Sequence, residues 1–277
     1  MFTLKRSRPA EGAAEGDASA GGGALPREQL RFFPRNDGPH PTRWEFPAWL
    51  DNPGVRWLQA LKELYAMPIA FPASLSPEAG LMLHGLIRNL QPRVIVEVGS
   101  FCSVSTHWMA SALREAGRTP GAGGPGGAEI HCFDDFGPIH KGPWRDAEML
   151  EGRLDFVKER LERAGLIDFV RFHKGLSWET LPAARDELAR LGGVDFAFID
   201  GDHSVPGATA DFHAVEPVLN TGGYVLLHDT FPEQCGGHMG PRHILDHAGT
   251  IGQGRYEQVE LYLSPLNYGM GLMRRVG

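Results

Sequence analysis

Two carboxylates and an imidazole follow directly after a hydrophobic run in the second half of the chain. The segment "FAFIDGDHSVPGA", residues 196–208, places Asp200, Asp202 and His203 after apolar residues typical of a buried strand. His203, with an ordinary pKa near 6.5, is a candidate general base at neutral pH. The alternative is structural: Asp202 or Ser204 caps the helix that follows.

A second polar pair, His228 and Asp229, ends the later hydrophobic run "GGYVLLHD". If the two strands are neighbours, Asp200 and Asp229 face one another, and two carboxylates that close repel unless they share a proton or a cation. Oxygen ligands with open positions suit Mg²⁺ or Mn²⁺. Such an ion binds a substrate hydroxyl and lowers its pKa, so that His203 can remove the proton.

The first buried run, "VIVEVGSFCSVST" at 94–106, has an acid and one glycine where it ends. It lacks the G-x-G-x-x-G pattern that brings a pyrophosphate to a helix N-terminus. Glu97 suits a ligand with an ammonium group, and Asp134, at the end of "EIHCFDDF", suits the two hydroxyls of a ribose. An ammonium-bearing nucleoside is S-adenosylmethionine. An ordinary strand–turn–helix with a solvated acid is the alternative.

Helical and strand-like segments alternate along most of the chain, which predicts an α/β fold with a Rossmann-like, doubly wound, mostly parallel sheet. Ligands bind such sheets at the carboxyl ends of the strands, where the polar residues above lie. The last two strand-like runs have no clear helix between them, which indicates an antiparallel edge. The expected helices are 54–66, 76–92, 103–116, 147–164, 179–192 and 205–219, and 117–128 is expected to be a long flexible loop. The expected strands are 93–100, 129–136, 169–175, 194–202, 222–229, 255–263 and 268–275.

Composition and charge exclude several classes of protein. The 277 residues carry a formal net charge of −7, which argues against a nucleic-acid surface. No run of about 18 apolar residues predicts a membrane span, and the Gly/Ala-rich start has no apolar stretch typical of a secretory signal. The three cysteines show no paired spacing, which favours a reduced, cytoplasmic protein. Residues 1–38 are predicted to be a disordered tail, and 39–75 an irregular arm with one helix.

The motifs "VEVGSFCSVST" and "FAFIDGDHSVPGATADFHAVEPVLNTGGYVLLHDT", in this order, resemble class I S-adenosylmethionine-dependent methyltransferases. The resemblance is closest to the metal-dependent sugar O-methyltransferases of macrolide biosynthesis and their cephalosporin-pathway relatives. It covers roughly 76–275 and implies that 76–277 is the methyltransferase domain.

Carried over residue by residue, the resemblance implies a catalytic base at His203 and metal ligands at Asp200 and Asp229. His228 stands where the sugar enzymes have an acid, and imidazole is a poor ligand for Mg²⁺. Either His228 points away, or the metal is softer, or no metal binds. The implied cofactor-binding residues are Glu97, Gly99, Ser100, Ser103, Asp134, Ser177 and Asp200.

The prediction is an O-methyltransferase that acts on a hydroxyl of a small secondary metabolite, with segments 39–75, 137–146 and 230–255 around the acceptor. A homo-oligomer is possible. The alternative from another class is a nucleoside-binding protein or complex subunit without catalysis. An NAD-linked oxidoreductase is disfavoured by the missing glycines. Weaker features are His243 and His247, four apart on a possible helix, and the tryptophans of the arm, for which packing is the favoured interpretation.

Overall fold

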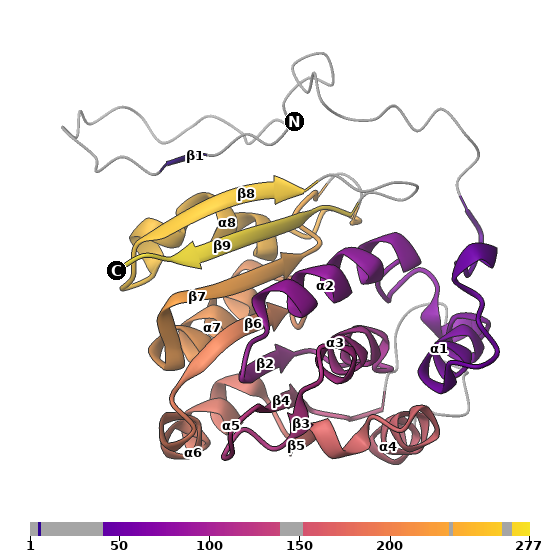
Figure 1. Cartoon of the computed structure of the whole chain (residues 1–277). Helices are drawn as coiled ribbons and strands as arrows, with labels where there is room; N and C mark the ends of the chain where they lie inside the picture. The colour runs from indigo at the N-terminus through magenta and orange to yellow at the C-terminus, as the bar shows by residue number, and fades with distance from the viewer. Residues whose placement is uncertain (1–4, 7–40, 139–151, 233–234, 262–267) are drawn as a thin grey trace.

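A mixed β-sheet lies at the centre of the molecule, and helices cover both of its faces (Figure 1). The computed structural model describes residues 5–6, 41–138, 152–232, 235–261 and 268–277. The strands are β1 (Lys5–Arg6), β2 (Val94–Val98), β3 (Thr119–Pro120), β4 (Gly127–Asp134), β5 (Val170–Lys174), β6 (Val194–Ile199), β7 (Leu219–His228), β8 (Tyr256–Leu261) and β9 (Met270–Arg275). Their order is β1-β8-β9-β7-β6-β2-β4-β3, and β5 pairs with β4.

The helices divide into two layers around this sheet. They are α1 (Arg56–Tyr65), α2 (Pro77–Leu90), α3 (Val104–Glu115), α4 (Arg153–Ala164), α5 (Ser177–Ala183), α6 (Arg185–Arg190), α7 (Val205–Val215) and α8 (Gly240–Ile251). One hydrophobic core unites α1 to α4 with one face of the sheet, and a second core unites α5 to α8 with the other. In Figure 1, α2 and α3 lie in front of the sheet, and α7 and α8 lie behind it.

The parallel strands β5, β4, β2, β6 and β7 confirm the predicted doubly wound arrangement. β2 is buried along its whole length, as its continuous apolar run indicates. The order reverses direction between β2 and β6, since β4 and β5 lie on one side of β2 and β6 and β7 on the other. This is the topological switch point, where ligands bind at the carboxyl ends of the strands.

The C-terminal strand β9 is antiparallel to both of its neighbours, β7 and β8. An antiparallel terminal strand is therefore confirmed, but β9 lies inside the sheet rather than at its edge. The two-residue strand β1 pairs with the outer side of β8. All other residues of the predicted disordered tail, 1–4 and 7–38, lie outside the described residues.

Three local expectations need correction. The predicted helix 179–192 is two short helices, α5 and α6, which are separated at Ala184. The predicted loop 117–128 contains β3, which pairs with the start of β4. The segment 230–255, expected to be a loop around the acceptor, contains α8, which packs against α7 and β8.

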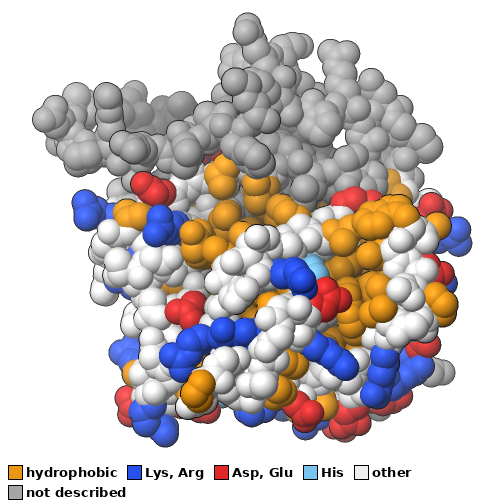
Figure 2. Space-filling view, viewed as in Figure 1, with side chains coloured by type: hydrophobic (Ala, Val, Ile, Leu, Met, Phe, Trp, Pro, Cys, Tyr) orange, Lys and Arg blue, Asp and Glu red, His pale blue; other side chains and the backbone are white. Residues whose placement is uncertain are grey.

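The arm packs on α4 and α3 through α1, and two of its tryptophans are buried. The indole N–H of Trp44 donates to the carbonyls of Ala70 and Ser74 at 3.0 and 3.1 Å. Trp57 is also buried, so packing is the correct interpretation for both, whereas Trp49 is 76% exposed. Basic and acidic side chains are interspersed on the face shown in Figure 2. Among the described residues, no helix combines the length and apolar character needed to cross a membrane.

Candidate active site

Asp200, His203, His228 and Asp229 form one cluster at the carboxyl ends of β6 and β7, which are parallel neighbours. His203 lies between the carboxylates: its Nε2 is 3.2 Å from Asp200 Oδ1 and its Nδ1 is 3.2 Å from Asp229 Oδ2. His228 Nδ1 is 3.3 Å from Asp200 Oδ1 and 3.2 Å from Asp229 Oδ1. The structure therefore brings together four of the five residues that the sequence singled out at these two strand ends, all but Asp202, and His228 points into the cluster.

The charges of this cluster stabilise one another. Burial disfavours the imidazolium of His228, but Asp229 and Asp200 outweigh it and raise its pKa to about 9. Burial also opposes a charge on His203, and the same two carboxylates raise its pKa above the ordinary value. Burial opposes the charge of Asp200 as well, yet the two imidazoles lower its pKa to about 2. Without another cation, the imidazoles themselves supply the positive charge that the carboxylates need.

The geometry of the cluster fits a divalent cation. Asp229 Oδ1 is buried and accepts no well-aligned hydrogen bond, although His228 Nδ1 lies 3.2 Å away. Ligand atoms of Asp200, His203 and Asp229 all lie within 4.8 Å of one another. Carboxylates alone favour Mg²⁺, whereas a set that includes imidazole nitrogens favours Mn²⁺ or another transition metal. Because His228 points into the cluster, the alternative in which it points away is wrong. A softer metal and no metal remain as the two alternatives.

A small cavity adjoins the cluster at the end of β2. Its lining includes Gly99, Ser100, Phe101, Ser105 and Asp200. Gly99 has a φ of +85°, and a Cβ there would lie 2.2 Å from the backbone oxygen of Asp200. Glycine is therefore required for the ends of β2 and β6 to approach this closely. The structure places three of the predicted cofactor residues, Gly99, Ser100 and Asp200, together at this cavity.

Glu97 is bonded within the chain on all the sides that the structure describes. Its side chain is fully buried, and its carboxylate accepts hydrogen bonds from Ser100 Oγ at 2.8 Å and Ser105 Oγ at 2.5 Å. Thr106 Oγ1 at 2.7 Å and Cys132 Sγ at 3.0 Å complete the set. Burial raises the pKa of Glu97, although these donors oppose the rise. Glu97 thus orders the turn after β2, an ammonium group would have to compete with these four donors, and the cofactor role of Glu97 stays a prediction.

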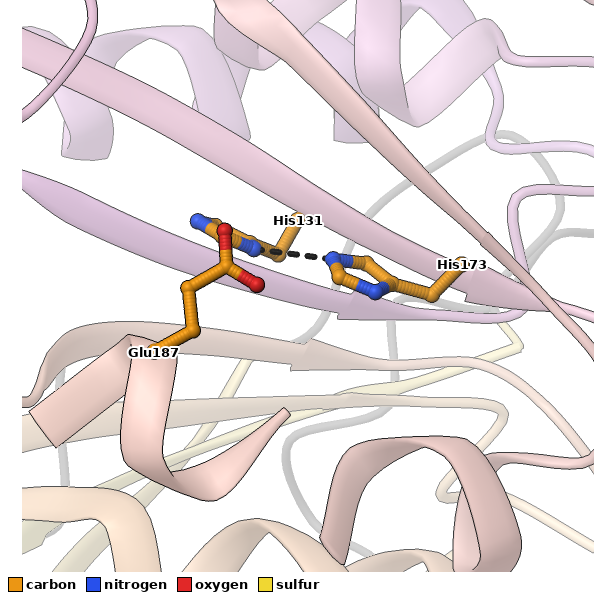
Figure 3. A group of neighbouring side chains, drawn as sticks. All are labelled: His131, His173 and Glu187. Atoms are coloured by element: carbon orange, nitrogen blue, oxygen red, sulfur yellow. Dashed lines mark hydrogen bonds between the residues drawn. The ribbon is translucent and has the colours of Figure 1, made fainter. Parts of the chain in front are cut away.

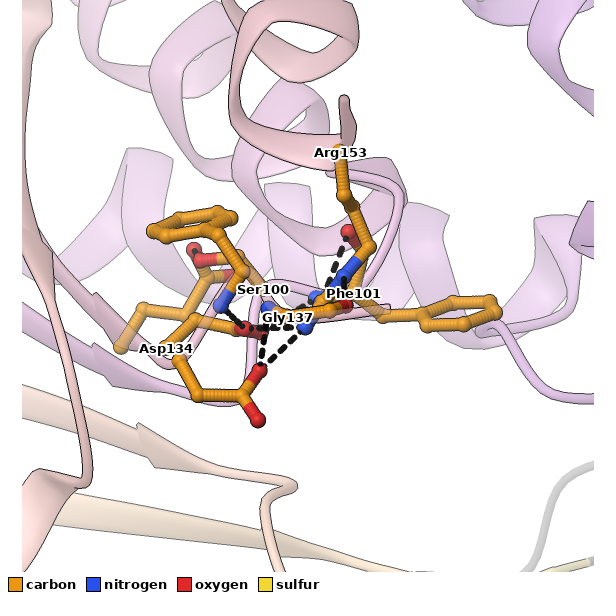
Figure 4. A network of polar contacts seen from close by, with 8 residues as sticks. Ser100, Phe101, Asp134, Gly137 and Arg153 are labelled. Carbon is orange, nitrogen blue, oxygen red and sulfur yellow. Dashed lines mark hydrogen bonds and ion pairs between the residues drawn. The ribbon is translucent and has the colours of Figure 1, made fainter. Parts of the chain in front are cut away.

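Asp134 is already engaged within the chain (Figure 4). Its carboxylate accepts from the backbone N–H groups of Phe101 at 2.9 Å and Phe136 at 2.7 Å. The guanidinium of Arg153 pairs with both oxygens, with Nη2–Oδ1 at 2.7 Å and Nη1–Oδ2 at 3.1 Å. A ribose that bonds to Asp134 must therefore compete with Arg153, and the ribose role stays a prediction.

Two predicted serines do not face the cavity. Ser103 is fully buried, and its hydroxyl donates to the carbonyl of Cys102 at 2.5 Å. Ser177 begins α5, and its hydroxyl donates to Asp211. For the segment 196–208, the helix-capping alternative is correct for Ser204, whose Oγ accepts from Gly207 N at 3.1 Å at the start of α7. Asp202 Oδ1 accepts from Ser204 N at 2.7 Å. Asp202 is therefore a structural residue of the turn.

Sequence reasoning missed several residues of the site. Ser105 reaches both Glu97 and the cavity, and its place in the first turn of α3 was the available signal. Arg153 and its pairing with Asp134 had no local signal. Tyr268 lies close to the cluster, with ring centroids 6.2 Å from His228, and burial together with Asp229 raises its pKa to about 12. The weaker pair His243 and His247 lies on α8, with ring centroids 4.4 Å apart.

The fold and the cluster define an α/β protein with a ligand site at the switch point of its sheet, and comparisons with known proteins agree. The family model described as a methyltransferase domain matches residues 96–230. A catechol O-methyltransferase from Niastella koreensis is 29% identical over 129 residues, which cover 47% of this chain and 46% of that protein. The chain therefore spans about half the length of this relative.

Solved structures share the fold over most of the chain. The O-methyltransferase TomG from Streptomyces achromogenes, which is involved in tomaymycin synthesis and was solved with S-adenosylmethionine, has a TM-score of 0.55 at 20% identity. That match covers 84% of this chain and 92% of TomG. An O-methyltransferase from Bacillus cereus, in complex with S-adenosylhomocysteine, has a TM-score of 0.60 at 20% identity and covers 83% and 94% of the two chains.

Residues 96–230 match the family model of a methyltransferase domain, and the chain has the α/β fold of class I S-adenosylmethionine-dependent methyltransferases. The predicted class is confirmed. The finer resemblance to the macrolide sugar and cephalosporin-pathway enzymes stays a prediction.

Proposed function

We propose that the protein transfers a methyl group from S-adenosylmethionine to a hydroxyl of a small secondary metabolite, assisted by a divalent cation. The observation that carries this proposal is the cluster of Asp200, His203, His228 and Asp229 beside the cavity at the end of β2. The cavity supports the cofactor's place, and the relatives act as O-methyltransferases by name. The chain's main contribution is to orient donor and acceptor.

His203 is the proposed base for the acceptor hydroxyl. Both of its ring nitrogens now face carboxylates, so it is held as an imidazolium and has no free lone pair. A cation bound by Asp200 and Asp229 supplies the positive charge in its place and lowers the pKa of a coordinated hydroxyl. His203 is then free to lose its proton and accept that of the acceptor.

Metal removal tests this proposal. We expect turnover, measured as S-adenosylhomocysteine formation, to be lost in chelator and restored by Mn²⁺ more effectively than by Mg²⁺, because His228 is in the cluster. The matched variant is Asp229→Asn, which keeps the shape of the side chain and should lose the response to metal. Turnover that resists chelation would refute the cation while leaving methyl transfer in place.

The pH dependence of cation binding, measured by titrating the protein with the metal, gives a second test. A cation must displace protons from His203 and His228, whose pKa values the carboxylates raise. Its apparent affinity should therefore increase as the pH rises from 6.5 to about 9, with proton release detected by calorimetry in buffers of different ionisation enthalpy. An affinity independent of pH over this range would place the cation elsewhere.

The remaining features of the proposal are a cytoplasmic location and an acceptor that lies near the arm. The alternative is a nucleoside-binding subunit without catalysis. This alternative predicts the same binding of S-adenosylhomocysteine but no turnover in the unmodified protein, so that a substitution of His203 would have no effect on activity.

A further inference from the structure

A second group of metal-ligating side chains lies on the sheet face covered by α6, apart from the candidate active site. It consists of His131 on β4, His173 on β5 and Glu187 on α6 (Figure 3). Each residue offers one ligand atom, and these atoms all lie within 4.8 Å of one another. The three residues come from three elements that are far apart in the chain.

Glu129 orients the first of these imidazoles. Its buried carboxylate is 2.9 Å from His131 Nε2. Because a carboxylate only accepts, Nε2 carries the proton and Nδ1 keeps its lone pair. That Nδ1 is 2.9 Å from His173 Nε2. A carboxylate behind the far nitrogen of an imidazole is the arrangement that fixes the tautomer of metal-binding histidines.

The second imidazole is held in place by stacking. The rings of His173 and Phe133 have centroids 4.3 Å apart and an interplanar angle of 9°. Burial and the neighbouring His131 lower the pKa of His173 to about 4, although Glu187 and Glu129 oppose the shift. His173 is therefore neutral at pH 7 and keeps a lone pair for a ligand. Glu187 is at least partly exposed, so the group is open to solvent on that side.

We propose that His131, His173 and Glu187 form a second metal site, which binds a zinc-type divalent ion and joins β4, β5 and α6. The ligand atoms are Nδ1 of His131, Nε2 of His173 and one carboxylate oxygen of Glu187, and His173 then carries its proton on Nδ1. Two imidazoles with one carboxylate are typical of Zn²⁺ sites with an open fourth position, whereas Mg²⁺ and Ca²⁺ prefer oxygen ligands alone.

The test uses the full chain with the active-site carboxylates neutralised by Asp200→Asn and Asp229→Asn, which removes the carboxylate ligands of the first site. We expect calorimetry with ZnCl₂ to show one ion per chain, and Co²⁺ to give the visible absorption of a site with nitrogen ligands. His173→Phe, which retains the stacking on Phe133, should abolish both signals. Glu129→Gln should weaken zinc binding by about 10–100-fold.

The control is His247→Ala, which removes a different pair of neighbouring histidines, on α8, and should leave zinc binding unchanged. Far-UV circular dichroism checks that each variant folds. If His173→Phe does not fold, Glu187→Gln decides, because this side chain is exposed, and it should weaken binding at least about tenfold. The proposal is overturned if the background chain binds no zinc, if binding survives the ligand substitutions, or if His247→Ala abolishes it.

Discussion

His203→Ala is expected to lower turnover by about 10²–10⁴-fold, with the affinity for S-adenosylmethionine nearly unchanged. The reason is the place of this imidazole between Asp200 and Asp229, 3.2 Å from each, where it is the proposed base for the acceptor. The loss should appear in the rate of S-adenosylhomocysteine formation at saturating cofactor. Cofactor affinity should survive because no predicted cofactor contact involves the imidazole.

The matched control for this variant is His213→Ala. His213 lies on α7, and its Nε2–H donates to the carbonyl of Ile251, 2.8 Å away, so its removal should leave turnover unchanged. A fully active His203→Ala enzyme would contradict the role of the base. His203 would then be a polar residue at a helix start that balances the charge of two carboxylates.

Glu97→Ala is expected to lower the free energy of unfolding by about 3 kcal/mol or more. The substitution leaves the hydroxyls of Ser100, Ser105 and Thr106 without their acceptor in a fully buried place. Each buried polar group left unsatisfied costs about 1–3 kcal/mol. Chemical denaturation, with the slope compared between variants, measures the effect.

Glu159→Ala on the exposed side of α4 is the control for this substitution, and it should change stability by no more than about 0.5 kcal/mol. The sequence alone favoured a direct contact between Glu97 and a ligand's ammonium group. A Glu97→Ala variant with unchanged stability but no affinity for S-adenosylmethionine would restore that interpretation and contradict the buried network.

The fold could be predicted well because its signals are local. The continuous apolar run of β2 and the alternation of elements define a parallel sheet, and parallel strands bring their carboxyl ends to one edge. Asp200 and Asp229 could be placed together for this reason alone. The direction of the His228 side chain could not be predicted, because it depends on the backbone conformation at the last residue of β7.

Other parts of the site depend on contacts between segments distant in sequence. Glu97 receives a hydrogen bond from Cys132 across the register of β2 and β4, which periodicity does not reveal. Arg153 reaches Asp134 from the start of α4, 19 residues further along the chain. The pair His131 and His173 likewise needs the register of β4 and β5, although each residue alternates with apolar neighbours in its own strand.

The most direct test of the central claim is a calorimetric titration of the protein with S-adenosylhomocysteine, with NAD as the competing nucleotide. The cavity at the end of β2, the acid cluster beside it and the lack of a pyrophosphate-binding glycine pattern predict binding of the sulfur nucleoside in the micromolar range, about −8 kcal/mol. NAD should give no heat of binding. Tight binding of NAD, with no response to S-adenosylhomocysteine or S-adenosylmethionine, would contradict the account.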